Sequence, residues 1–270
     1  MTIEYRNLIN SGNFKFTPLL TLSGNKNKVI DIGTAADAGL IEDLYGNIYL
    51  PNRNNVFFAQ LANVYAIGQP ARSFYGYRTD GLIQNAEDAA GHLGPRGIIG
   101  RVKYVDLSGD GKIGPEDRTI IGNPNPDFFG SLNLAFQYKK WDASVFFDGV
   151  YGNEIFDMQK YTRTAAISKR WTPDNPNNEY RRHIDISGGD LVSDHYVADG
   201  SYLRLQNISL GYTTEIRKIA NTKLRLYLNV DNIYTWTKYA GYSPEVGLEG
   251  LDFGGIPRTS TTTIGLDITF

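Results

Sequence analysis

The sequence predicts an all-β fold, an antiparallel up-and-down transmembrane β-barrel of which this chain supplies about six to eight strands. The first observation is alternation, clearest in residues 261–270. One side of that extended stretch carries Thr262, Ile264, Leu266, Ile268 and Phe270. The second is length, because such a strand, at ~3.3 Å per residue and tilted by ~40°, rises roughly 25 Å, the height of the apolar band of an outer-membrane barrel. The third is a composition of Tyr 18, Phe 13 and Gly 29, which favours strands and turns.

Composition also excludes several classes of protein. A mean hydropathy of -0.33 and the absence of an apolar run of about 18 residues exclude a membrane-spanning helix. They do not exclude a barrel, because lipid-facing and interior-facing residues alternate. The net charge of -2 offers no basic field to nucleic acid. Without cysteine, the 270 residues hold neither disulfides nor thiolate metal sites.

Alternation predicts the other strands in order. Residues 128–139 and 141–150 form a hairpin with a tight turn at Lys139 and Lys140. In 201–212 the apolar positions change side, which indicates a bulge near Gln206 and Asn207. Three further stretches are candidates for extended structure: 13–22, 56–66 and 74–83. Residues 224–233 alternate as clearly as the last strand.

Strand order predicts which connections share a side of the membrane. If the carboxyl end is periplasmic, the short turns around Lys140 and Ile216 are periplasmic as well. The long connections 151–198 and 237–258, and the loop 84–126, then lie outside. Within them, 153–164 is a candidate for a short helix.

A calcium-like motif lies in that outer loop. The run DLSGDGKIGPED matches a twelve-residue calcium loop in which a glycine folds the chain back and hard oxygen ligands converge. The predicted ligands are Asp106, Ser108, Asp110, the carbonyl of Lys112, and Asp117. The alternative is an Asp-Gly turn with solvated acids.

Aromatic residues gather at the outer end of the strand 224–233. Trp236, Tyr239 and Tyr242, with Tyr234, are candidates for stacking on a substrate sugar. A membrane-interface girdle needs fewer assumptions and is favoured.

Several motifs resemble one family. They are YVDLSGDGKI and DRTIIGNPNPDFFG within 104–144, FYGYRTDG at 74–81, DGSYLRLQNISLGY at 199–212 and NIYTWTKYAGYSPE at 232–245. Together they resemble the SusC/RagA-type TonB-dependent outer-membrane transporters of Bacteroidetes. The resemblance implies a plugged barrel in the cell outer membrane that imports oligosaccharides, or sometimes peptides, with energy relayed by TonB. A SusD-like surface lipoprotein would be its lid and substrate binder.

The same resemblance predicts that the chain is a part of such a protein. Residues 1–10 lack a signal-peptide pattern, and the family's plug domain and TonB-contacting segment are not recognisable in 1–270. We therefore expect the carboxy-terminal part of a receptor barrel, because about 22 strands are typical of plugged transporters.

Other interpretations stay open. One is a soluble calcium-binding β module of a carbohydrate-active or adhesion protein, and another is a small stand-alone outer-membrane barrel. An enzyme is the weakest, because His92, His183 and His195 lack metal-ligand spacing and no nucleophile or phosphate-loop motif is present. We expect His183 and His195 to be exposed. The acids Asp190, Asp194 and Asp199 are expected to be solvated.

Overall fold

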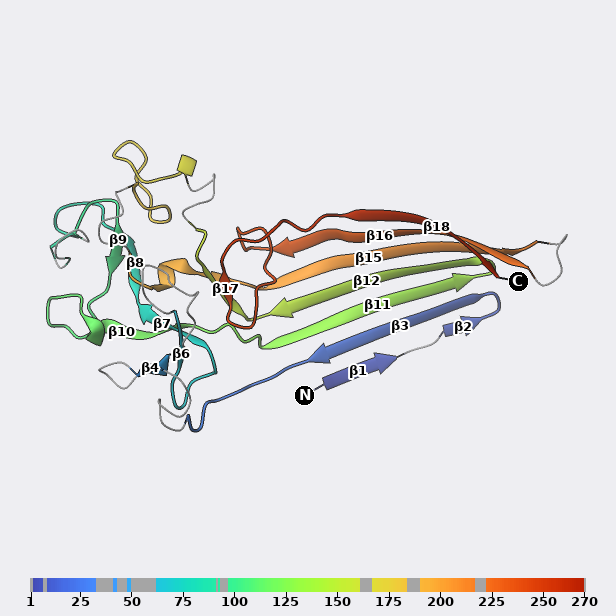
Figure 1. Cartoon of the computed structure of the whole chain (residues 1–270), viewed down its shortest axis with the longest axis horizontal. Helices are drawn as coiled ribbons and strands as arrows, with labels where there is room; N and C mark the ends of the chain where they lie inside the picture. The colour runs from blue at the N-terminus through green and yellow to red at the C-terminus, as the bar shows by residue number, and fades with distance from the viewer. Residues whose placement is uncertain are drawn as a thin grey trace.

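The computed structural model describes residues 2–6, 9–32, 41–42, 48–49, 62–90, 92, 97–160, 167–183, 190–216 and 222–269. They form two regions: a long curved antiparallel sheet and a cap of shorter strands at one end of it (Figure 1). We define the cap as the described residues of the three long connections, 24–127, 152–201 and 238–260. No helix among the described residues is long and apolar enough to cross a bilayer.

The main sheet has eight strands in the order β1-β3-β11-β12-β15-β16-β18, with β2 also paired to β3. Its strands are β1 Thr2–Arg6, β2 Ile9–Ser11, β3 Phe14–Ser23, β11 Phe128–Tyr138, β12 Trp141–Tyr151, β15 Tyr202–Glu215, β16 Lys223–Thr237 and β18 Thr261–Thr269. Every pair is antiparallel. The predicted partial, up-and-down antiparallel barrel is therefore confirmed. Phe270 lies outside the described residues.

Two local predictions are also confirmed. β11 and β12 pair from Phe128↔Tyr151 to Tyr138↔Trp141, and Lys139 takes a positive φ of 53° in the turn between them. The register of β15 shifts between Leu205 and Asn207 against β16. The extra residue there re-phases the alternation, as expected of a bulge.

The two ends of the sheet differ in connection length. The turns β2–β3, β11–β12 and β15–β16 lie at one end together with the carboxyl terminus (Figure 1). All three long connections leave from the other end and build the cap. This is the asymmetry that strand order predicted.

The cap contains three small sheets, ordered β10-β7-β6-β5-β4, β14-β13-β17 and β8-β9. Their strands are β4 Ile41–Glu42, β5 Ile48–Tyr49, β6 Asn63–Tyr65, β7 Ser73–Tyr77, β8 Thr79–Leu82, β9 Val102–Tyr104, β10 Arg118–Gly122, β13 Glu154–Asp157, β14 Val197–Asp199 and β17 Leu251–Asp252, with short 3-10 turns η2 Pro115–Asp117 and η3 Asp194–Tyr196. The predicted strand 56–66 is described only from residue 62, where it contains β6.

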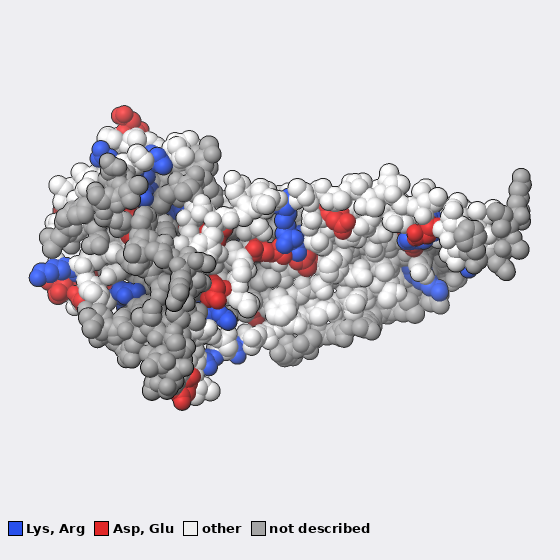
Figure 2. Space-filling view, in the orientation of Figure 1, with Lys and Arg blue, Asp and Glu red and all other residues white. Residues whose placement is uncertain are grey.

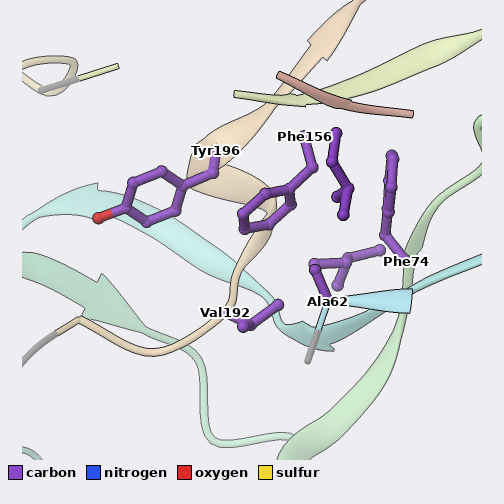
Figure 3. Packing of buried hydrophobic residues seen from close by; sticks show 7 residues of the cluster. Ala62, Phe74, Phe156, Val192 and Tyr196 are labelled. Atoms are coloured by element: carbon purple, nitrogen blue, oxygen red, sulfur yellow. The ribbon is translucent and has the colours of Figure 1, made fainter. Parts of the chain in front are cut away.

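Two apolar cores hold the cap together. In the first, Phe74, Phe156 and Tyr196 pack with Ala62 and Val192, as Figure 3 shows. The second consists of Tyr77, Leu82, Val102, Tyr104, Trp171 and Leu191. Both cores draw residues from connections that are far apart in sequence, so the connections fold as one unit.

The helix expected over 153–164 is wrong where the structure describes it, because Glu154–Asp157 is the strand β13. Pairing with β14 and β17 buries Ile155 and Phe156 completely. Tertiary pairing overrides the local pattern there, and residues 161–164 lie outside the described part of the chain.

Candidate functional site

One face of the main sheet is apolar from β3 to β18. The register sets Leu132 between Leu20 and Phe147, and the same alignment continues across β15, β16 and β18. We call this surface the apolar face: Leu20, Leu22, Leu132, Leu134, Val145, Phe147, Leu203, Leu205, Ile208, Leu210, Leu226, Leu228, Ile264 and Leu266. Ile264 is 73% exposed and Leu266 56%. A continuous exposed apolar surface of this extent is typical of contact with lipid.

Aromatic side chains border the apolar face at both ends. At the cap end Phe128 stacks on Tyr151 with centroids 4.9 Å apart. Tyr234 and Trp236 meet there edge to face at 4.9 Å. At the turn end the pairs are Phe16 with Phe136 at 4.7 Å and Trp141 with Tyr212 at 4.8 Å. Rings at both limits of an apolar band are the interfacial girdles expected of an outer-membrane barrel.

The opposite face is polar and carries charged side chains in small mixed-sign groups along the sheet (Figure 2). Nearest the cap, Arg204 is buried and its Nη2 and Nε donate to Asp148 at 2.7 and 2.9 Å. Its Nη1 donates to Glu245 at 2.8 Å, and Glu245 also pairs with Arg258. Glu245 belongs to the connection 238–260, so the group fastens that connection to the sheet.

A second group lies toward the turn end. Arg225 of β16 donates to Asp142 of β12 at 2.7 Å, across the intervening strand β15. A Cβ on Gly211 would lie 2.5 Å from the Asp142 carboxylate, so only glycine leaves room for this pair. Asp267 of β18 lies 3.7 Å from Arg225. Bidentate and shared contacts of this kind fix the orientation of the charged side chains. A face that carries such groups is suited to water rather than to lipid.

The predicted calcium loop is closed by Asp117, which is fully buried at the end of η2. One carboxylate oxygen accepts the backbone N–H groups of Leu107 and Ser108, each at 2.9 Å. The other accepts the N–H of Gly114 at 2.7 Å. The carboxylate thereby holds the two ends of the loop together.

Asp106 organises the middle of the loop. It accepts the N–H of Gly111 at 2.7 Å and the hydroxyl of Ser108 at 3.1 Å. These contacts, that of Gly111 most of all, hold the pKa of the Asp106 carboxyl below its usual range. Asp110 accepts the N–H of Lys112 at 2.9 Å. The Asp106 carboxylate is therefore ionised at neutral pH.

The loop's donor set has the chemistry of a hard-cation site. Asp117 Oδ1 already accepts two N–H groups, whereas Asp117 Oδ2 and Asp110 Oδ1 accept one each and keep a lone pair that a cation could use. Within the described ranges, no three His, Asp or Glu side chains are grouped to hold a metal ion. Calcium binding stays a prediction.

The three aromatic residues predicted to stack on sugar occupy different environments. Trp236 borders the apolar face in the cap-end girdle. Tyr239 is buried, and its hydroxyl donates to Asp252. Tyr242 is 64% exposed in the connection 238–260. Of the three, Tyr242 is the one with a ring open to a soluble ligand.

The exposure expected of several polar residues is partly wrong. His183 and Asp199 are exposed as predicted, whereas His195 and Asp190 are buried in the cap. Asp190 accepts the hydroxyl of Tyr196 at 2.6 Å and pairs with Arg181 at 2.9 Å. Folding of the long connection into a core explains the difference.

Two histidines of the cap are held neutral. His92 Nε2 accepts the N–H of Tyr104 at 2.8 Å, and burial lowers the His92 pKa. Burial, with a smaller contribution from Lys160, lowers the pKa of His195 to about 3. Burial in the cap therefore explains why both histidines are neutral.

Comparison with curated proteins shows which family this chain is related to. The chain is 30% identical over its whole length to the TonB-dependent receptor P3 of Formosa agariphila, and 29% identical over 97% of its length to the receptor P26 of that organism. It is 30% identical over 62% of its length to the TonB-dependent receptor SusC of Bacteroides thetaiotaomicron. This chain is a homologue of the SusC-type TonB-dependent receptors. No protein-family profile matches it.

Solved structures agree with this assignment at the level of the fold. The whole chain superposes on 28% of a chain of the RagAB peptide importer in its open-open state, with a TM-score of 0.73 at 18% identity. The RagAB peptide transporter gives the same TM-score. The chain spans about 28% of the length of the receptors P3 and P26. These relatives are receptors and transporters rather than enzymes.

The charged groups on the polar face are the site residues that sequence reasoning missed. Asp142 and Asp148 stand at polar positions of an alternating strand, and Arg204 and Arg225 do so on later strands. That pattern, opposite charges on the interior side of neighbouring strands, was available in the sequence. The contact to Glu245 was not, because a long irregular connection precedes it.

Proposed function

We propose that this chain forms part of the wall and the outer cap of a transporter in the cell outer membrane. The transporter would import oligosaccharides, or peptides, with energy relayed by TonB. The observation that carries the proposal is the two-faced sheet, apolar between aromatic girdles on one side and charged on the other. Homology to SusC and the fold shared with RagAB support it.

In this proposal the cap lies outside the cell. Short turns at one end and long folded connections at the other are the asymmetry of bacterial barrels, whose long loops are extracellular. The polar face would border the interior that a plug fills and substrate crosses. A SusD-like lipoprotein would meet the cap, and the TonB complex would act through a part of the receptor other than 1–270.

Oligosaccharide is the substrate class we favour, with peptide as the alternative. Tyr242 offers an exposed ring at the cap end, on which a sugar ring could stack. Trp236 and Tyr239 would contribute only if substrate contact reorganised the girdle and the connection 238–260.

Trypsin treatment of outer-membrane vesicles from cells that make the full-length protein tests the location. We expect protection of residues 128–139, which comprise β11 and Lys139 of the following turn, and cleavage within the cap from outside. Rapid cleavage at Lys139 in sealed vesicles would instead support a soluble module. Growth of a deletion strain on single glycans or on peptides then separates the two substrate classes.

We also propose that the loop 106–117 binds calcium as a structural ion. Asp106, Ser108, Asp110, the Lys112 carbonyl and Asp117 would hold it. The ionised Asp106 and the motif spacing support this. Calcium would join the carboxylates and tighten the loop.

Asp110→Ala tests the ion without breaking the loop, because this exposed carboxylate accepts only the local N–H of Lys112 among the contacts described here. We expect calcium to raise protease resistance of the loop in wild type and not in the variant. Glu116→Ala, exposed and outside the predicted ligand set, is the control. If a chelator leaves wild type and Asp110→Ala alike, the loop is a carboxylate-organised turn.

A further inference from the structure

A hollow of about 920 Å³ opens at the cap end of the apolar face. Gly130 and Gly149, which are register partners on β11 and β12, leave its floor without side chains. Its walls come from Leu22, Leu132 and Leu203. The space is thus a gap in an otherwise continuous apolar surface.

The hollow lies over the middle strands of the sheet rather than over an edge strand. β11 and β12 are flanked by β3 and β15, all from this chain. Strands that extend the sheet beyond β1 or β18 would not cover it. Since the hollow is continuous with the lipid-facing band, hydrocarbon is the environment that reaches it.

The cap end of the hollow is ringed by amphipathic and charged groups. Tyr151 and Trp236 form part of the rim, and Asp199 and Lys238 lie beyond them. Both charged side chains are exposed. Asp199 and Lys238 line the same end of the hollow and interact electrostatically, so together they complement a head group that also carries both signs, whereas Asp199 would repel a purely anionic head group.

We propose that this hollow is a binding site for one acyl chain of a membrane lipid whose zwitterionic head group, with phosphate and amine, meets Lys238 and Asp199. The inference rests on the proposed outer-membrane location. A bound chain would fill the space above Gly130 and Gly149 and would order the cap-end girdle around it.

Native mass spectrometry of the full-length protein in detergent, titrated with phosphatidylethanolamine, tests the site. Wild type is expected to retain one lipid saturably, and more weakly when phosphatidylglycerol replaces it. Leu203→Trp would fill the hollow and weaken binding about tenfold, because losing contact with two methylene groups accounts for such a factor. Leu210→Trp is the matched control, since Leu210 lies on the same strand and face but outside the hollow.

Two results would overturn the site. One is equal lipid retention by wild type and Leu203→Trp. The other is a protein dimer in wild type that Leu203→Trp abolishes, which would make the hollow a contact between two copies. Lys238→Gln is expected to reduce the preference for phosphatidylethanolamine and leave barrel assembly intact. Because vesicle fractionation reports membrane location separately, a receptor found in the outer membrane with unaltered lipid retention refutes only this inference.

Discussion

The sheet and the cap place the same kinds of side chain in opposite environments. In the cap, Phe74 and Phe156 are fully buried and Tyr196 is 1% exposed. On the sheet, Ile264 and Leu266 are 73% and 56% exposed. The cap is therefore built as a water-soluble protein is, whereas the sheet presents its apolar residues outward.

This difference shows that the hydrophobic effect has two outcomes, depending on what covers the apolar side chains. Apolar surface leaves water in both regions. In the cap it does so by packing against other side chains, while the apolar face of the sheet needs lipid to cover it. Substitutions in the two regions should consequently differ in their effect on stability. They should also differ in whether a bilayer is needed to detect that effect.

The largest effect is expected from Phe156→Ala in the cap core. Truncating a fully buried aromatic costs about 3–5 kcal/mol, from lost transfer free energy and the cavity left behind. Hydrogen exchange should show cap amides opening while amides of β11 and β12 stay protected. Phe253→Ala, a half-exposed ring in the same region, should change exchange little. Equal losses in both variants would mean that the cap has no core of its own.

Next in size is Leu266→Arg on the apolar face. A cation at the middle of a lipid-facing strand costs about 2–4 kcal/mol of folding free energy in a bilayer. Refolding of the full-length protein into vesicles, followed by denaturant titration, measures it. Thr263→Arg, on the polar face of the same strand, should cost much less. A reversed order would place water, not lipid, against Leu266.

Acidification should weaken the cap and spare the sheet. His195 has a pKa of about 3 in the cap and about 6.5 when unfolded. Between these values the unfolded state binds the additional proton, so the free energy of unfolding falls as pH falls, by at most about 1.4 kcal/mol per unit. His92 acts in the same direction.

Cap protection factors at pH 7 and pH 5, corrected for intrinsic exchange, measure this effect. His195→Gln should reduce the difference. All three histidines lie at residues 92, 183 and 195, outside the strands of the main sheet, so β11 and β12 serve as an internal control. If protection factors in the sheet fell as much as those in the cap, the pH effect would not come from the cap histidines.

The smallest effect is expected from Trp236→Ala. Loss of one girdle ring should lower barrel stability by on the order of 1 kcal/mol and slow assembly. Uptake per assembled receptor should not change. Trp141→Ala, in the girdle at the other end, is the matched control. If only Trp236→Ala reduces uptake per receptor, sugar stacking by Trp236 is supported instead of anchoring.

How far the fold could be predicted follows the same division. Strands 128–139, 141–150 and 224–233 show period-two alternation, and the structure contains them as β11, β12 and β16. The cap shows no such period. Ile155 and Phe156 are buried by β14 and β17, which follow them by dozens of residues, so no local pattern marks them.

The candidate site divides likewise. Spacing alone singled out Asp106 and Asp117 as candidate calcium ligands, and in the structure both carboxylates accept N–H groups of their own loop, while calcium binding stays a prediction. It did not reveal that Arg204 fastens Glu245 to the sheet. A contact of that kind depends on where a long irregular connection returns, which local sequence does not encode.

By itself, the sequence determined the class of fold, the strands of the sheet, the bulge near Gln206 and the two faces, since alternation with period two is a property of neighbouring residues. Tertiary structure alone decided the cap: which residues form its cores, why His195 is neutral, and how Arg204 and Glu245 meet. Burial there is created by segments distant in the chain, and only the folded molecule brings them together.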